Sequence, residues 1–184
     1  MVRIETKRLI IRDHILEDLE PLHNLLSDNE VMYFLPDIKT RTIEESKSDL
    51  NEAIIEAQKG KDRLKYYFAI FDKNNNYIGE IGYSVISSNP SGDKNVHLGY
   101  FIHKKYWRKG ITTEAVRALI EYAFIIGNVH KIETGCLKDN IASEKIMIKC
   151  GFTREAEKID YMFLDGKWRD RVEYRLLKKE YNNK

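Results

Sequence analysis

Residues Tyr106–Ala115, YWRKGITTEA, form a basic turn with one glycine that leads into a long segment with helical periodicity. The apolar positions after the turn recur at helical spacing, at Val116, Leu119, Ile120, Ala123 and Ile126. A helix is therefore predicted from near Thr112 to Gly127. The first-turn amides of a helix have no partner within it and carry the positive end of its dipole. With Arg108 and Lys109 beside them, these amides are expected to bind a phosphate or pyrophosphate.

Two common nucleotide-binding motifs do not fit this turn. A Walker A loop needs Gly-x-x-x-x-Gly-Lys-Ser/Thr, whereas Lys109 precedes Gly110 here and Lys105 stands where the first glycine belongs. A dinucleotide-binding fingerprint needs three glycines, and this turn has one. The phosphate site therefore belongs to another class of protein.

The turn resembles the acyl-CoA pyrophosphate loop of the GNAT N-acetyltransferases, written Gln/Arg-x-x-Gly-x-Gly/Ala. Within that superfamily it resembles the RimJ/RimL type of protein N-terminal acetyltransferase, whose usual form is Tyr-Trp-Gly-Lys-Gly-Tyr-Ala-Thr-Glu-Ala. Trp107 stands where many relatives carry Gln or Arg, and Thr112 replaces the small Gly or Ala.

A second match lies 30 residues past Gly110. Asn140-x-x-Ser143 and the following Lys149–Phe152 resemble the family's Asn-x-x-Ser/Ala and Lys-x-Gly-Phe pair. The opening phrase of residues 6–12, Thr-x-Arg-Leu-x-Ile-Arg, and the turn at 165–170 also resemble the RimJ/RimL group. The resemblance therefore covers nearly the whole chain.

The resemblance implies an α+β (mixed α/β) fold: one GNAT-like domain over residues 1–184, with a mostly antiparallel central sheet, one parallel splayed strand pair and flanking helices. The pair is predicted at Val96–Ile102 and Lys131–Leu137, because the helix between them is a crossover connection. In the family, acyl-CoA lies in the gap between these two strands. Further strands are expected at Leu9–Arg12, Tyr66–Phe71, Tyr77–Ile86, Phe152–Leu164 and Trp168–Leu177. Further helices are expected from Asp18 as N-cap, from Thr42 to Gly60, and from Asn140 to Cys150.

The resemblance also implies acetyl-CoA as cosubstrate and a set of residues that bind it. Backbone groups of the first strand would pair with pantetheine, the basic turn would hold the pyrophosphate, and the second motif would contact the pantetheine arm. These residues are Tyr100, Phe101, Ile102, Arg108, Lys109, Gly110, Ile111, Thr112, Thr113, Asn140, Ser143 and Lys149. Asn140 is also a good helix N-cap, and that simpler role would account for it alone.

Acetyl transfer to an amine needs a proton for the leaving thiolate. Many GNAT enzymes supply it from a Tyr seven residues past the Asn, but that position is Met147 here. Ser143 stands where RimL-type enzymes carry a serine thought to take this role. The acid function is therefore assigned to Ser143.

The same reaction needs a base for the amine. His97 occupies the strand position where relatives often have Glu, and an imidazole titrates near neutral pH. A histidine on a strand can equally be structural. Glu80 and Tyr83 on the preceding predicted strand are the alternative bases.

Composition excludes several classes of protein. Lys plus Arg at 31 against Asp plus Glu at 29 gives a net charge of +2, which argues against a nucleic-acid binder. No metal-ligand spacing and no run of eighteen apolar residues occurs, so neither a metal nor a membrane is expected. Cys136 and Cys150 are expected to be free thiols of a reduced, cytoplasmic protein, and residues 1–8 are not expected to be a signal peptide.

The predicted function is an N-acetyltransferase that acts on an amine by direct attack, as a monomer or homodimer. The acceptor is expected to be a protein N-terminal α-amino group, as in the RimJ/RimL enzymes, or a small amine such as a polyamine, aminoglycoside or amino acid derivative. A group of acidic residues near an apolar loop at 30–36 would suit a cationic acceptor: Asp28, Glu30, Asp37, Glu44 and Glu45. A non-catalytic acyl-CoA-binding module is the second hypothesis.

Overall fold

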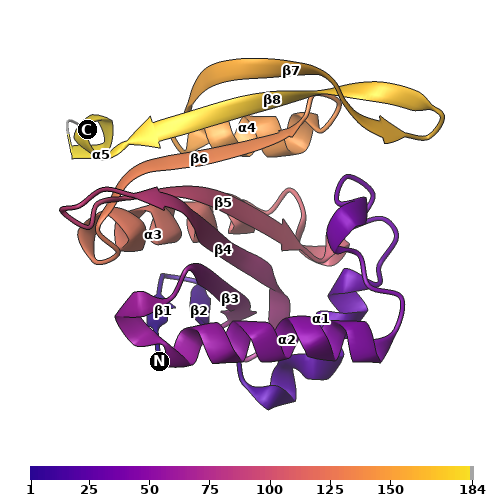
Figure 1. Cartoon of the computed structure of the whole chain (residues 1–184). Coiled ribbons are helices and arrows are strands. Elements are labelled where there is room, and N and C mark those ends of the chain that lie inside the picture. The colour runs from indigo at the N-terminus through magenta and orange to yellow at the C-terminus, as the bar shows by residue number, and fades with distance from the viewer. Residues whose placement is uncertain (183–184) are drawn as a thin grey trace. The chain divides into compact units, whose positions relative to one another are not determined.

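The computed structural model describes residues 1–182 and divides the chain into two compact units (Figure 1). The first unit contains Met1–Ser84 and Gly99–Tyr122; the second contains Val85–Leu98 and the chain from Ala123 onward. Strands β4 and β5 and helix α3 each pass from one unit into the other. One domain over residues 1–184 stays a prediction.

The secondary structure is mixed, as predicted. The strands are β1 (Arg3–Glu5), β2 (Leu9–Asp13), β3 (Lys65–Asp72), β4 (Tyr77–Ser88), β5 (Lys94–Ile102), β6 (Val129–Leu137), β7 (Thr153–Leu164) and β8 (Lys167–Leu177). The α-helices are α1 (Leu19–Leu26), α2 (Ile43–Gln58), α3 (Ile111–Ile125), α4 (Ile141–Lys149) and α5 (Lys178–Asn182). Short 3-10 turns are η1 (Leu16–Asp18), η2 (Pro36–Ile38), η3 (Gly60–Asp62) and η4 (Lys104–Tyr106). The strands follow the order β1-β2-β3-β4-β5-β6-β8-β7.

In the first unit, β1 to β4 are antiparallel neighbours, and α1 packs against α2 beside them (Figure 1). The alternating burial of β2 shows that one of its faces lies in the core. The core cluster joins leucines of both helices to aromatic residues of β3 and β4: Leu22, Leu25, Leu26, Leu50, Phe71 and Tyr77. The predicted capping box at Thr42 and Glu45 is present at the start of α2.

The N-cap prediction for Asp18 is half right. Asp18 precedes α1, but its carboxylate makes no capping bond to that helix. Instead it binds the Arg12 guanidinium through two contacts of 2.8 Å and accepts a bond from the Ile15 amide at 3.0 Å. A charged partner from the neighbouring strand outcompetes the local amide, because charge-assisted, bidentate bonds are the stronger ones.

In the second unit, β5 and β6 form the predicted parallel pair, from Lys94 opposite Val129 to His97 opposite Glu133. Strand β8 lies antiparallel between β6 and β7, and Figure 1 shows β7 and β8 as one long hairpin. The hairpin turns at Asp165 (φ 50°) and Gly166 (φ 76°), where consecutive positive φ angles match the twist of the strands. The fold class is therefore confirmed.

Among residues 1–182, no helix combines the length and the apolar character that crossing a membrane requires.

Candidate active site

The basic turn leaves β5 and enters α3 within the first unit. The Trp107 indole donates a hydrogen bond of 2.9 Å to the Ile102 carbonyl, which ties the turn to the end of β5. Arg108 (φ 59°) and Gly110 (φ 72°) both adopt the left-handed conformation. The helix begins at Ile111, one residue before the predicted start. Two left-handed residues in three reverse the chain sharply, so the first-turn amides of α3 follow directly on the two basic residues.

Arg8 also contacts this turn, and this contact was not among the sequence-based predictions. Its guanidinium donates to the Lys109 carbonyl at 2.9 Å and to the Glu114 carboxylate at 2.6 Å. The same carboxylate accepts bonds from the Thr6 hydroxyl (2.6 Å) and the Arg8 amide (3.0 Å). Glu114 thus fastens the β1–β2 turn to the first turn of α3 and places a third cation beside Gly110.

Space and charge at Gly110 fit a phosphate. A Cβ built on Gly110 would come within 4 Å only of the Arg8 Nη2 atom, at 3.6 Å. Its positive φ angle disfavours any other residue. Arg8, Arg108 and Lys109 supply positive charge around the helix N-terminus, where anions bind best. This donor set would suit a pyrophosphate, and the pyrophosphate site at this turn stays a prediction.

The predicted pantetheine strand is positioned by a glycine of the neighbouring strand. Within the first unit, a Cβ on Gly79 of β4 would overlap the Phe101 carbonyl oxygen and lie 2.6 Å from the Ile102 Cα atom. The His103 amide also bonds the Ile78 carbonyl at 2.9 Å. Only glycine allows so close an approach, so Gly79 sets where Phe101 and Ile102 lie. Tyr100 and Phe101 are half-buried and Ile102 is buried.

The second motif lies at the start of α4 in the second unit. The Asn140 Oδ1 atom accepts a bond of 3.2 Å from the Ser143 amide, which is the N-cap role that Asn140 alone would explain. Ser143 is half-buried in the first turn, Met147 is buried, and Lys149 is exposed at the far end of the helix. Lys149 therefore lies at the opposite end of α4 from Asn140 and Ser143.

Cys136 packs beneath this turn. Its sulfur lies 3.7 Å from the Asn140 carbonyl. Burial raises the pKa of the Cys136 thiol to about 11, although a hydrogen bond from Ser143 opposes the shift. The thiol is therefore protonated and unreactive near neutral pH. Within residues 1–182, neither Cys136 nor Cys150 is part of a disulfide, as expected.

His97 is exposed on β5 and contacts β8. Its Nε2 atom lies 3.3 Å from the Arg171 Nη2 atom. Surrounding strands partly desolvate the ring, and this desolvation, together with the Arg171 charge, lowers the pKa of His97. His97 is therefore uncharged at neutral pH.

The two predicted catalytic residues lie on opposite faces of β6. Cys136 faces α4 and Ser143, because successive side chains on a strand alternate between faces. Its neighbour Gly135 faces the other way, where the Arg171 side chain that contacts His97 crosses the strand. Within the second unit, the structure does not bring His97 and Ser143 together on one face.

The alternative base Glu80 belongs to a buried network in the first unit. One carboxylate oxygen lies 2.8 Å from His14 Nε2, and the other accepts the Tyr77 hydroxyl. His14 Nδ1 lies 3.4 Å from an Asp18 oxygen, close enough for an ion pair but not aligned for a hydrogen bond. Burial alone would lower the pKa of His14, but the two carboxylates raise it to about 9. Glu80 therefore faces a cation and a hydroxyl, an arrangement that holds strands together.

Tyr83 is a poor base for a different reason. It is buried and stacks on Tyr66 with ring centroids 4.4 Å apart. Burial raises the pKa of Tyr83 far above its usual value, and among residues 1–182 its hydroxyl has no hydrogen-bond partner. A phenol that resists ionisation does not accept protons at neutral pH.

Most of the acidic residues near the apolar loop are used in local structure. Asp28 accepts hydrogen bonds from the Glu30 amide (2.8 Å) and the Val31 amide. The Glu30 carboxylate pairs with Lys104, and the Glu45 carboxylate completes the capping box of α2. Within residues 1–182, Asp37 and Glu44 make no ion pair. The same residues contain no group of three or more His, Cys, Asp or Glu side chains placed to hold a metal ion.

Comparison with known proteins agrees with this geometry. Residues 8–153 match the model of the acetyltransferase (GNAT) domain family. The chain is 29% identical to the N-acetyltransferase YnaD of Bacillus subtilis (strain 168), over 98% of this chain and 100% of that protein. It is 33% identical to the ribosomal protein uS5-alanine N-acetyltransferase of Escherichia coli (strain K12), over 61% of this chain and 57% of that protein.

A solved structure shares the fold. The spermidine N-acetyltransferase from Vibrio cholerae, in complex with CoA and spermine, superposes with a TM-score of 0.84 at 22% identity, over 97% of this chain and 100% of that chain. The family model spans most of the sequence, and both of its predicted motifs form helix N-termini here. The protein belongs to the GNAT family of acetyltransferases and is an acetyl-CoA-dependent N-acetyltransferase similar to the RimJ/RimL type.

Proposed function

We propose that the acceptor is the α-amino group of a protein N-terminus. The observation that carries this proposal is the use of acidic side chains near the apolar loop: Asp28 and Glu30 are engaged in local bonds, which leaves few carboxylates for a polycation. The similarity to an enzyme named for an alanine of ribosomal protein uS5 supports the same acceptor class.

Acetyl-CoA would be held by the residues predicted from the sequence, together with Arg8. Arg8, Arg108 and Lys109 would neutralise the pyrophosphate at the α3 N-terminus, and Gly110 would let it approach the backbone. The backbone of Tyr100–Ile102 would pair with the pantetheine arm. Bound acetyl-CoA supplies the activated acyl group; the protein positions it and moves the protons.

His97 and Ser143 are the two proposed proton-handling residues, and because they lie on opposite faces of β6, each would act from its own side of the thioester. His97, uncharged at neutral pH, would accept the proton that the amine loses on attack, directly or through one water. Ser143, in the first turn of α4, would donate a hydrogen bond from its hydroxyl to the departing CoA sulfur and so stabilise the thiolate, which then takes its proton from water. A thiol has a pKa of about 8.5, so its thiolate needs only modest help to leave near neutral pH.

A panel of acceptors tests the proposal. We would incubate the protein with acetyl-CoA and peptides with free N-termini, the same peptides with blocked N-termini, spermidine and an aminoglycoside, and follow CoA release and product mass. The free peptides should give the highest kcat/KM, and the blocked peptides should give none. Acetylation of spermidine alone would assign a small-amine acceptor, and no acetylated product at all would leave a coenzyme-binding module.

A further inference from the structure

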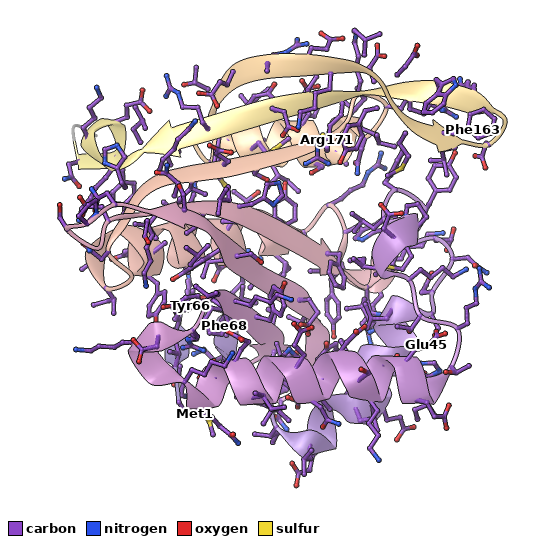
Figure 2. The ribbon with its side chains drawn as sticks, viewed as in Figure 1. Met1, Glu45, Tyr66, Phe68, Phe163 and Arg171 are labelled. Atoms are coloured by element: carbon purple, nitrogen blue, oxygen red, sulfur yellow. The ribbon has the colours of Figure 1, made fainter. Side chains whose placement is uncertain are left out.

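We propose that Arg171 is a positioning residue for His97. The Arg171 side chain reaches across β6 over Gly135 and contacts the imidazole of His97. Its guanidinium keeps the imidazole uncharged and determines which ring nitrogen bears the lone pair. This inference rests on the proposed role of His97 in proton transfer. Figure 2 labels Arg171 on β8, the strand next to β6.

The register of the strands makes the contact possible. His97 of β5 is opposite Glu133 of β6, and Gly135, two residues further along β6, is opposite Glu173 of β8. Side chains two apart on a strand share a face, so Gly135 leaves a gap in the row between β5 and β8. Arg171 and His97 are 74 residues apart in sequence, yet their side chains meet across this gap.

Gly135 is required for this crossing. A Cβ at Gly135 would overlap the Glu173 carboxylate and lie 2.6 Å from the Val172 carbonyl and 2.9 Å from Arg171 Nη2. Any side chain there would displace the guanidinium from its path. Glycine in a strand interior weakens the strand, and its presence here is explained by the close approach it permits.

The chemistry of arginine fixes the state of the histidine. A guanidinium has five N–H donors, no acceptor, and never loses its charge in proteins. The His97 nitrogen that faces it must therefore accept, so it bears the lone pair and the other ring nitrogen carries the proton. An imidazolium would present a second N–H and a second positive charge to Arg171, which opposes protonation.

Other charged groups around His97 raise or lower its pKa. Glu173 on β8 and Glu133 on β6 favour the charged ring, whereas Lys158 on β7 opposes it. Desolvation and Arg171 outweigh the two carboxylates, so the pKa of His97 is lowered. Removing Arg171 removes a charge that lowers the pKa while both carboxylates stay, so the pKa of His97 would rise.

Arg171 also has partners that keep it in place when the lone pair is used. Its Nε atom donates to Glu173 at 2.9 Å, and its guanidinium lies 5.1 Å from the centre of the Tyr161 ring. The contact with His97 is longer, at 3.3 Å, and weaker. An amine that approaches His97 could therefore replace Arg171 at the lone pair while Glu173 and Tyr161 retain the guanidinium.

Nitrogen-15 NMR of the histidine rings tests the inference without any assay of activity. The His97 resonances are assigned by their loss in His97→Gln. In the wild type, the neutral ring should show the proton on Nδ1, and Arg171→Gln should move the titration to higher pH. Arg171→Lys, which keeps the charge on a more flexible side chain, should fall between the two.

Arg169→Gln is the matched control. Arg169 lies on the same strand and pairs with Asp139, so its loss removes one cation without touching His97. A His97 titration that is unchanged in Arg171→Gln, or that moves equally in Arg169→Gln, would overturn the inference. A neutral ring with its proton on Nε2 would overturn it as well.

Kinetics separate this inference from the proposed function. With the preferred acceptor, Arg171→Gln should lower kcat/KM about two- to fivefold below pH 6 and leave it unchanged above pH 8, because a higher pKa leaves more of His97 protonated only at acidic pH. A shifted NMR titration with an unchanged acidic limb of the pH profile would keep Arg171 as the group that tunes His97 and remove His97 from catalysis.

Discussion

His14 should make the protein less stable as the pH rises into the alkaline range. It is 4% exposed and lies 2.8 Å from Glu80 and 3.4 Å from Asp18. These carboxylates hold its pKa at about 9 in the folded protein, against 6.5 for an unperturbed histidine. The folded state therefore keeps a proton that the unfolded chain has already lost. Stability from this group is complete below pH 6.5 and is lost as pH rises through 9.

The magnitude follows from the difference between the two pKa values. Each pKa unit corresponds to about 1.4 kcal/mol, so a change from 6.5 to about 9 is worth about 3 kcal/mol of unfolding free energy. Small proteins have a total stability of about 5–15 kcal/mol, so the loss should be easy to resolve.

Urea unfolding at a series of pH values measures this loss of unfolding free energy. We expect the unfolding free energy to fall by about 3 kcal/mol between pH 6 and pH 9.5. In His14→Gln, much of this dependence should disappear, while His130→Gln, at an exposed position, should keep it. Parallel pH dependences in the wild type and His14→Gln would show that Glu80 and Asp18 do not hold His14 in its charged form.

Three further outcomes test the coenzyme site and its supports. Gly110→Val should abolish most of the stabilisation by acetyl-CoA, which at about one hundred times Kd is worth roughly 2.7 kcal/mol, with the unliganded Tm as the control for folding. Ser143→Ala should lower kcat about ten- to a hundredfold and leave acetyl-CoA affinity within about threefold, and an unchanged kcat in single-turnover experiments would show that Ser143 does not stabilise the departing thiolate. Gly79→Ala should raise KM for acetyl-CoA more than it lowers kcat, because it displaces the Phe101 and Ile102 backbone, and an unchanged KM would show that this backbone does not bind the coenzyme.

The elements that local signals define could be predicted from the sequence. The glycine turn before α3, the capping box of α2 and the Asp165-Gly166 hairpin each depend on residues within a few positions of one another. Their backbone preferences are strong enough to hold in the folded chain. The parallel pair followed from the helix between its strands. The strand β1, of three residues, was too short to give any periodic signal.

The contacts that complete the site could not be predicted, because they join residues far apart in sequence. Arg8 and Glu114 are 106 positions apart, and nothing near either residue indicates the other. Gly135 read alone is an ordinary strand glycine; its role appears only when β8 brings Arg171 and Glu173 over it. Asp18 was assigned to the helix it precedes, whereas Arg12 on β2 takes its carboxylate.

The turn at Tyr106–Ala115 is the proposed pyrophosphate site, and a comparison of two acyl donors tests this role most directly. Isothermal titration calorimetry would measure Kd for acetyl-CoA and for S-acetylpantetheine, which carries the same thioester without the pyrophosphate. Wild-type protein should bind acetyl-CoA at least about tenfold more tightly, with a salt-dependent difference, and Gly110→Val should remove that difference. Equal Kd values for the two donors in the wild type would contradict the assignment of this turn as the pyrophosphate site.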